Sequence, residues 1–211
     1  MRVIKILDIE IPLFDGNIGI SASGGADSSL LLYILLLNKK ETIEVFTLAS
    51  DLKGRLSAKT ATNIIDKCIQ LTNNNNINHH IVYTDEQTVD NLFKLPKYML
   101  QNKKITKLYT GVTSNPPKNI ADDFLGPEEN YEQDERNPLI TKPTILDDFC
   151  LPFFNVDKLK IAEMYQHLGL MDTLFPLTRS CELKNPPMDF IGHCDNCWWC
   201  KERFWGFKRF V

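Results

Sequence analysis

The sequence predicts an α/β protein with a parallel sheet and helices on both faces. In the first half of the chain, short runs rich in β-branched residues alternate with helical patterns. This order is typical of parallel sheets, because two parallel strands need a crossover between them. A turn rich in glycine and serine follows the first of these runs. The chain has 211 residues, which suits a single domain covering residues 1–211.

Each element follows from its local pattern. Strands are expected at residues 17–22, 42–50, 79–84 and 104–112. Helices are expected at residues 28–37, 57–71 and 88–101, and Pro96 interrupts the last of these. One more helix is expected at residues 157–168, where Gly169 supplies a C-terminal stop. In such sheets ligands bind beyond the carboxyl ends of the strands.

Residues 115–148 lack periodicity and are rich in proline and acidic side chains. A loop of this length either has a function or is a solvated, mobile insertion. We expect its acidic part, residues 122–135, to act as a lid that keeps water from a reactive intermediate.

Composition narrows the class of protein. The net charge of −3 gives no basic field, so nucleic acid is not an expected partner. The longest apolar run, residues 30–37, is too short to cross a bilayer, and the N-terminus does not resemble a signal peptide. We therefore expect a cytoplasmic protein without membrane contact, whose six cysteines are thiols or metal ligands.

The stretch SASGGADSSLLLYILL, residues 21–36, joins the first predicted strand to the first predicted helix. Such a turn aims backbone N–H groups and the positive end of the helix dipole at one point, where phosphate can bind. An ordinary strand-to-helix turn capped by Asp27 or Ser28 is the alternative. The two common nucleotide fingerprints, G-x-x-x-x-G-K-[ST] and G-x-G-x-x-G, are absent.

The segment SGGADSS, residues 23–29, resembles the PP-loop of ATP pyrophosphatases, S-G-G-x-D-S. The resemblance implies that ATP is cut between its α and β phosphates and that AMP passes to a substrate oxygen. It implies catalytic roles for Asp27 and Ser28, with Asp27 reaching Mg²⁺. The residues that it places at ATP are Ser21, Ser23, Gly24, Gly25, Asp27, Ser28, Ser29, Ala49, Ser50, Asp51 and Gly111.

Three cysteines near the C-terminus, Cys194, Cys197 and Cys200, have the spacing C-x-x-C-x-x-C, and Cys181 lies upstream. Four thiolates at such spacing predict a structural zinc site in a small C-terminal lobe, residues 178–211. An iron–sulfur site stays open as an alternative, and His193 is a possible substitute ligand.

The two motifs together resemble the 7-cyano-7-deazaguanine synthases of queuosine biosynthesis. The pattern that follows the last ligand in that family is C-x-x-R-x-x-G/A-F. It is matched here by Cys200, Arg203, Gly206 and Phe207. Ser180 stands before the first ligand, as in the family. Lys158 occupies the family's lysine position, although Lys160 replaces the glutamate that follows it there.

This resemblance implies an ATP-dependent carbon–nitrogen ligase acting on a small substrate and ammonia. A carboxylate on a deazaguanine, 7-carboxy-7-deazaguanine, would be adenylated and converted to the amide or the nitrile. Lys158 would neutralise phosphate charge, although a solvated lysine at a helix start is the alternative. Candidate acceptor contacts are Thr113, Ser114, Asn115, Arg179 and Arg203. Arg203 could instead brace the zinc lobe.

The middle of the chain departs from the family. Residues 113–137 do not contain its deazaguanine-recognition segment, so the acceptor stays open. A tRNA-modifying or sulfur-transfer enzyme, a ligase for another acceptor and a nucleotide sensor are the rival readings. A homodimer is expected, and the aromatic side chains of residues 198–210 are expected to pack, including at its interface. A stacking platform for a base is the other interpretation.

Overall fold

The computed structural model describes residues 1–49, 54–84, 89–124, 142–181 and 192–211, without the side chains of residues 54–56 and 89. Two residues expected at ATP, Ser50 and Asp51, lie outside the described residues, as does most of the expected lid.

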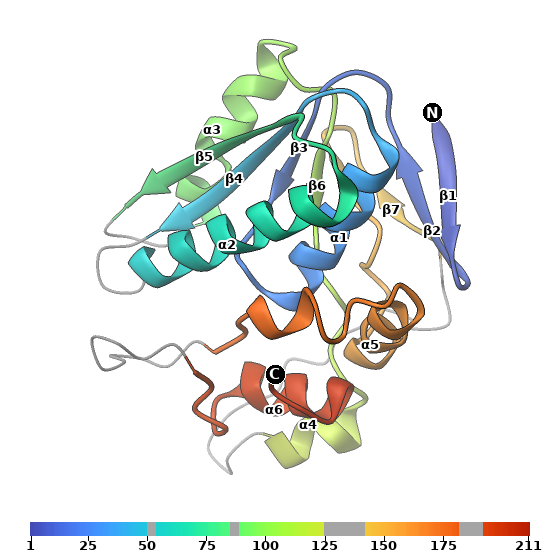
Figure 1. Cartoon of the computed structure of the whole chain (residues 1–211), viewed down its shortest axis with the longest axis vertical. Helices are drawn as coiled ribbons and strands as arrows, with labels where there is room; N and C mark the ends of the chain where they lie inside the picture. Colours follow the sequence, from blue (N-terminus) through green and yellow to red (C-terminus); the bar gives the residue numbers. More distant parts are fainter. Residues whose placement is uncertain (50–53, 85–88, 125–141, 182–191) are drawn as a thin grey trace.

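A six-stranded sheet forms the centre of the molecule, with the order β5-β4-β3-β6-β8-β7 (Figure 1). Its strands are β3 Ile18–Ser21, β4 Ile43–Ala49, β5 Ile77–Tyr83, β6 Leu108–Thr110, β7 Thr144–Ile145 and β8 Phe149–Leu151. All neighbouring pairs are parallel except β7 with β8. The predicted α/β class with a parallel sheet is therefore confirmed.

Helices cover both faces of this sheet. They are α1 Ala26–Asn38, α2 Gly54–Thr72, α3 Val89–Gln101, α4 Lys118–Phe124, α5 Lys158–His167 and α6 Trp198–Phe207, with the short 3-10 helix η1 Phe175–Leu177. Helices α1 and α2 lie together on one face and α3 on the other (Figure 1). A large core lies under α1 and α2, and a smaller one, around Phe46 and Met99, lies under α3.

Several boundaries differ from the sequence prediction. Helix α3 continues through Pro96 without a break, and β6 is shorter than the predicted strand at residues 104–112. The segment 115–148 is not wholly irregular, because α4 and β7 lie within it. Strand β8 and helix α6 were not predicted.

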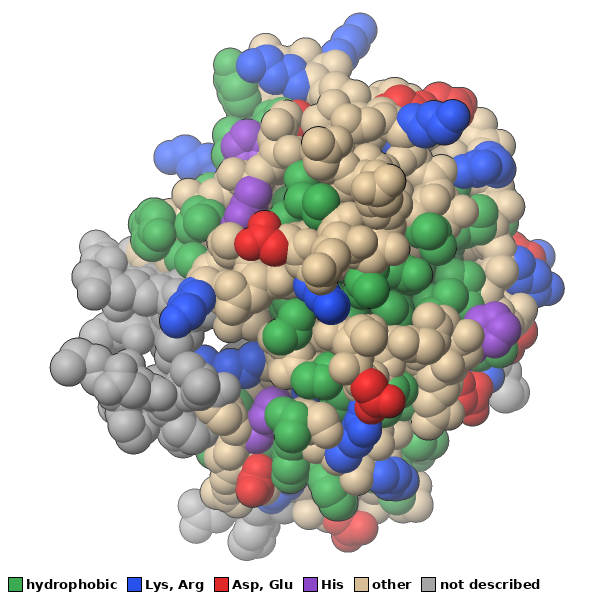
Figure 2. All heavy atoms as spheres, viewed as in Figure 1, with side chains coloured by type: hydrophobic (Ala, Val, Ile, Leu, Met, Phe, Trp, Pro, Cys, Tyr) green, Lys and Arg blue, Asp and Glu red, His purple; other side chains and the backbone are tan. Residues whose placement is uncertain are grey.

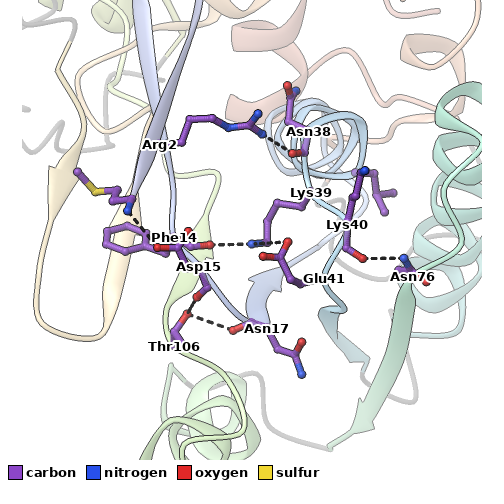
Figure 3. Close-up of polar contacts among 12 residues, drawn as sticks. Arg2, Phe14, Asp15, Asn17, Asn38, Lys39, Lys40, Glu41, Asn76 and Thr106 are labelled. Atoms are coloured by element: carbon purple, nitrogen blue, oxygen red, sulfur yellow. Dashed lines mark hydrogen bonds and ion pairs between the residues drawn. The ribbon is translucent and has the colours of Figure 1, made fainter.

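An N-terminal hairpin was also missed by the sequence analysis. Its antiparallel strands are β1 Arg2–Ile6 and β2 Ile9–Leu13. Buried Lys39, just after α1, fixes the end of this hairpin by donating to the Phe14 carbonyl oxygen at 2.7 Å (Figure 3). Thr106, which precedes β6, donates to the carbonyl oxygens of Asp15 and Asn17 (Figure 3). These contacts hold the hairpin against the end of the sheet at which the parallel strands begin.

Charged side chains of both signs are interspersed on the face drawn in Figure 2. Over the described ranges, no helix combines the length and the apolar character needed to span a membrane.

Candidate active site

The turn between β3 and α1 is shaped by its glycines. Gly24 has a positive φ of 84°, and a Cβ there would lie 2.9 Å from a side-chain carbon of Thr60 on α2. Gly25 is the N-cap of α1. The backbone can therefore turn tightly at the carboxyl end of β3 and present the amide groups of the first turn of α1.

The hydroxyls of this loop do not all point the same way. Ser29 is buried and its Oγ donates to the Gly25 carbonyl oxygen at 2.6 Å. Ser28 Oγ lies 3.3 Å from the same carbonyl and 3.4 Å from Ser23 Oγ. Ser29 therefore stabilises the helix start, whereas Ser23 and Gly25 line the neighbouring cavity.

The end of β6 lies against the start of α1. A Cβ at Gly111 would come within 2.7 Å of the backbone nitrogen of Ser28, so only glycine allows this approach. The close packing brings Thr113 beside the loop, where its Oγ1 lies 3.3 Å from the Lys158 ammonium.

Lys158 is the first residue of α5 and is buried rather than solvated, with 6% of its surface exposed. Its ammonium donates to the Asp27 carboxylate and lies 3.6 Å from the carboxylate of Glu202 on α6. A Cβ at Gly206 would lie 2.5 Å from Lys158 Cβ, so glycine lets α6 approach α5 closely. Three elements far apart in the sequence thus bring one ammonium and two carboxylates together.

The charges in this cluster are unequal. Burial alone disfavours the Lys158 ammonium, but Asp27 and Glu202 outweigh it and hold the lysine pKa above its usual value. Burial raises the pKa of Glu202, which Lys158 only partly opposes. Within the described part of the chain, the buried Asp27 Oδ1 has no hydrogen-bond partner. An unpartnered buried carboxylate oxygen is suited to bind a hard cation such as Mg²⁺.

A cavity of about 570 Å³ lies at this edge of the sheet. Of the predicted site residues, it is lined by Ser21, Ser23, Gly25, Asp27, Gly111, Thr113, Asn115, Lys158, Arg179 and Cys181. Predicted residues that are described but do not line it are Gly24, Ser28, Ser29, Ala49, Ser114, Arg203, Cys194, Cys197 and Cys200. The phosphate loop, the turn after β6 and the cysteine lobe therefore share one cavity.

The prediction that Arg203 contacts an acceptor is wrong. Its side chain braces the tail of the chain instead. The side chain is fully buried and stacks over Phe175, with 4.0 Å between the guanidinium carbon and the ring centre. It donates to the Thr178 hydroxyl at 2.9 Å and to the Phe210 carbonyl oxygen at 2.9 Å. Burial lowers its pKa to about 10. These contacts hold the tail of the chain against η1.

Two further expected contacts are displaced from the cavity by packing. Ala49 is buried at the end of β4, so its side chain is part of the core. Ser114 is also buried, and its backbone amide donates to the Val156 carbonyl oxygen at 2.9 Å.

Several cavity residues were missed by the sequence analysis. Glu202 comes from α6, and Thr60 and Leu92 come from α2 and α3. Trp198 and Trp199 of α6 also line the cavity, which the sequence analysis considered only as an alternative to packing. A carboxylate within the mostly aromatic segment WWCKERFWGF was the available signal for Glu202. Nothing in the local pattern indicates Thr60 or Leu92.

The four predicted metal ligands lie together. The Sγ atoms of Cys181, Cys194, Cys197 and Cys200 are all within 4.8 Å of one another, and those of Cys194 and Cys200 are 3.9 Å apart. Four thiolates around one zinc ion at about 2.3 Å would be about 3.8 Å apart. A four-iron cluster has a separate metal ion for each thiolate and spreads them farther. The cluster therefore fits a single zinc ion.

The ionisation of these thiols is also consistent with a bound cation. Burial by itself would raise the pKa of Cys194, but hydrogen bonds from the backbone amides of Cys197 and Asn196 lower it to about 6. Burial raises the pKa of Cys200, so a cation is needed to keep all four as thiolates. His193 stacks on Phe210 with ring centres 5.3 Å apart, in agreement with a loop histidine beside the site.

No protein-family model matches this chain, and no curated protein does. Solved structures do match. A 4-thiouridine synthetase, solved as an RNA complex with bound ATP, is 18% identical with a TM-score of 0.50, over 82% of this chain and 46% of that one. An NMN synthetase from Francisella tularensis is 15% identical with a TM-score of 0.44, over 79% and 66% of the two chains.

A U34-tRNA thiolase from Methanococcus maripaludis, solved with its 4Fe-4S cluster, is 12% identical with a TM-score of 0.46, over 83% and 60% of the two chains. This chain spans less than two thirds of the length of each of these proteins. It shares the fold of the synthetase that was solved with ATP bound.

Proposed function

We propose that this chain is an ATP-dependent carbon–nitrogen ligase that adenylates a carboxylate and replaces the AMP with ammonia. The observation that carries this proposal is the meeting of the S-G-G-x-D-S loop, Lys158 and the rim of the cysteine cluster in one cavity. The resemblance to 7-cyano-7-deazaguanine synthases supplies the reaction class and the first acceptor to test, 7-carboxy-7-deazaguanine.

The loop side of the cavity suits a triphosphate. Ser23 and Gly25 line the cavity beside the first turn of α1, whose free backbone N–H groups attract phosphate oxygens. Lys158 would leave its carboxylate partners in part and pair with phosphate, which stabilises the charge that develops on pyrophosphate. Asp27 Oδ1 would hold Mg²⁺, which supplies charge neutralisation when bound.

The proposed reaction proceeds through an acyl-adenylate. A carboxylate oxygen of the acceptor attacks the α phosphorus, the bond between the α phosphorus and the bridging oxygen breaks, and pyrophosphate leaves. Ammonia then attacks the carbonyl carbon and loses a proton, and AMP leaves with the electron pair of the broken C–O bond. The product is an amide. A second ATP would adenylate the amide oxygen with release of pyrophosphate. The amide nitrogen would then lose both of its protons, and AMP would leave with the electron pair of the broken C–O bond to give the nitrile.

The four cysteines would hold one structural zinc ion. All four positions of a tetrahedral ion are filled by thiolates, so the ion would have no open position for substrate. Cys181 lines the cavity, and the other three ligands precede or begin α6. The ion would therefore fasten α6, with Glu202, to the segment that carries Arg179.

A sulfur-transfer activity is less well supported. The two cysteines outside the cluster, Cys68 and Cys150, are buried, and burial raises the pKa of each to about 12. A buried thiol of this kind does not present the thiolate that sulfur delivery needs.

The test is a product analysis with purified protein. The chain is incubated with ATP, Mg²⁺, ammonium and 7-carboxy-7-deazaguanine, and the products are identified by mass. We expect AMP, pyrophosphate and the amide or nitrile in fixed proportion. Formation of ADP and phosphate, or a thiolated product when tRNA and a sulfur donor are added, would contradict the proposal.

A further inference from the structure

The cavity has two different walls on either side of the phosphate loop. One wall comes from β4, α2 and α3 and contains Leu48, Thr60 and Leu92. The other comes from the C-terminal lobe and contains Arg179, Trp198 and Trp199. Residues 111–113 and Asn115, which follow β6, also line the cavity, and β3 separates β4 from β6 in the sheet. The loop after β3 therefore lies between the lining residues that come from β4 and those that follow β6. The cavity can therefore hold a nucleoside on one side and a second molecule on the other.

The second wall carries the aromatic side chains of the cavity. Among the described lining residues, Trp198 and Trp199 are the aromatic ones. Trp198 packs edge-on against Phe124 of α4, with ring centres 5.5 Å apart. Trp199 is 45% exposed. A large aromatic surface thus faces the cavity from the first turn of α6.

Exposure alone is not the argument, because α6 has another exposed aromatic residue. Phe204 is 49% exposed, but it does not line the cavity and packs against Phe210, with ring centres 5.2 Å apart. Trp199 differs because it lies between the cysteines at 197 and 200, both members of the four-thiol cluster. The backbone on both sides of Trp199 is therefore fixed, which reduces the entropy lost when a ligand stacks on its ring.

We propose that Trp199 is the surface on which the planar ring of the acceptor stacks, and that the substrate class is a planar heteroaromatic carboxylate. This inference rests on the proposed function. With its ring against Trp199, the acceptor would direct its carboxylate toward the triphosphate whose β and γ phosphates are expected at the loop of Ser23 and Gly25. Stacking on tryptophan is tolerant of ring type, so such a surface does not need the recognition segment that this chain lacks.

The first test is a titration that does not depend on turnover. The chain has three tryptophans, so the double variant W198F/W205F leaves Trp199 as the single tryptophan, which is excited at a wavelength that the six tyrosines do not absorb. We expect 7-carboxy-7-deazaguanine to quench its fluorescence to saturation, and benzoate to quench it more than cyclohexanecarboxylate does. No saturable quenching by 7-carboxy-7-deazaguanine, or equal quenching by the planar and saturated acids, would overturn the inference.

The second test uses steady-state kinetics. We expect Trp199→Ala to raise KM for the acceptor about tenfold or more, with KM for ATP unchanged, and Trp199→Phe to retain most of the affinity. Phe204→Ala is the matched control on the same helix and should leave both constants unchanged. A rise in KM for ATP instead, or no change in KM for the acceptor, would refute the stacking role.

The proposed ligase activity and the proposed stacking role of Trp199 can be refuted separately. If the unaltered chain releases AMP with 7-carboxy-7-deazaguanine but Trp199→Ala has unchanged constants, the ligase stands and the stacking surface does not. If the unaltered chain releases no AMP with any carboxylate, the ligase itself is wrong and the inference falls with it.

Discussion

The two ends of the parallel sheet each bury a lysine, and their surroundings differ. At the end where the strands begin, the Lys39 ammonium binds one backbone carbonyl oxygen and lies 3.3 Å from the half-exposed Glu41 (Figure 3). At the opposite end, Lys158 meets two buried carboxylates, those of Asp27 and Glu202, and lines a cavity.

Under the proposed function, the difference separates a structural charge from a functional one. Lys39 has one charged partner, Glu41, and holds the hairpin in place. Its ammonium is paired by this carboxylate and by the Phe14 carbonyl oxygen, both within the fold. The Lys158 cluster contains more negative than positive charge and a buried carboxylate oxygen without a partner among the described residues. In the proposed function Mg²⁺ and ATP complete this cluster, and perturbed charge clusters of this kind are typical of active sites.

The largest expected effect is on catalysis at Lys158. Lys158→Met should lower kcat by about 10²–10³-fold, because it removes a positive charge aimed at the developing pyrophosphate. The matched variant Lys39→Met should leave kcat within about twofold, because Lys39 does not line the cavity. Both are measured by AMP release at a temperature where circular dichroism shows each variant folded. Equal losses of kcat in the two variants would show that the two lysines do not differ in this way.

A large effect on stability is expected from the cysteine cluster. Cys197→Ser should release the zinc ion and lower the free energy of unfolding by about 3 kcal/mol or more, because metal binding contributes directly to folding of such lobes. Zinc content by elemental analysis and urea unfolding are the measurements. Iron in place of zinc, together with a visible absorption band, would contradict the assignment.

How much of this site can be predicted depends on how far apart in the sequence the contacting residues are. The S-G-G-x-D-S loop and the C-x-x-C-x-x-C spacing are local, so the motifs alone place them. The contact of Lys158 with Asp27 joins residues 131 positions apart, and only the packing of α5 against α1 and α6 creates it. Arg203 illustrates the same limit, because an arginine that braces a buried turn and one that binds a substrate carboxylate look alike in sequence.

The strands and helices can likewise be divided into those that the sequence predicts and those that it does not. The strands and helices of the sheet were predictable because their apolar patterns are strong. The N-terminal hairpin carries charges within short apolar runs, and β7 and β8 are two and three residues long, so their patterns are too short to read. Helix α6 has aromatic residues on several faces, and its periodicity is therefore weak.

A moderate effect on stability is expected at Lys39. Lys39→Met should lower the free energy of unfolding by about 1–3 kcal/mol, because the partly buried Phe14 carbonyl oxygen loses its donor. Urea unfolding at pH 7 measures this change. A variant as stable as the unaltered chain would show that the hairpin does not depend on this bond.

The smallest expected effect concerns pH. The pKa of Glu41 is lowered, first by a hydrogen bond from its own backbone amide and then by the nearby Lys39 ammonium. Its contribution to stability is therefore present above its unfolded value near 4.5 and is lost as the pH falls through the lower folded pKa. Glu41→Gln should remove this contribution, so the variant should be slightly less stable than the unaltered chain by a constant amount from about pH 6 to 9, with the deficit disappearing as the pH falls toward 3. Unfolding measured from pH 3 to 9 gives the difference profile, and a difference that grows as the pH falls below 4.5 would have the wrong sign.

The central claim is that the cavity beside Lys158 splits ATP between its α and β phosphates to activate a carboxylate. The most direct measurement is the exchange of labelled pyrophosphate into ATP, in the presence of 7-carboxy-7-deazaguanine and without ammonium. The account predicts exchange that depends on the carboxylate, persists in Lys39→Met and is lost in Lys158→Met. Exchange that is absent from the unaltered chain, or that survives in Lys158→Met, would contradict it.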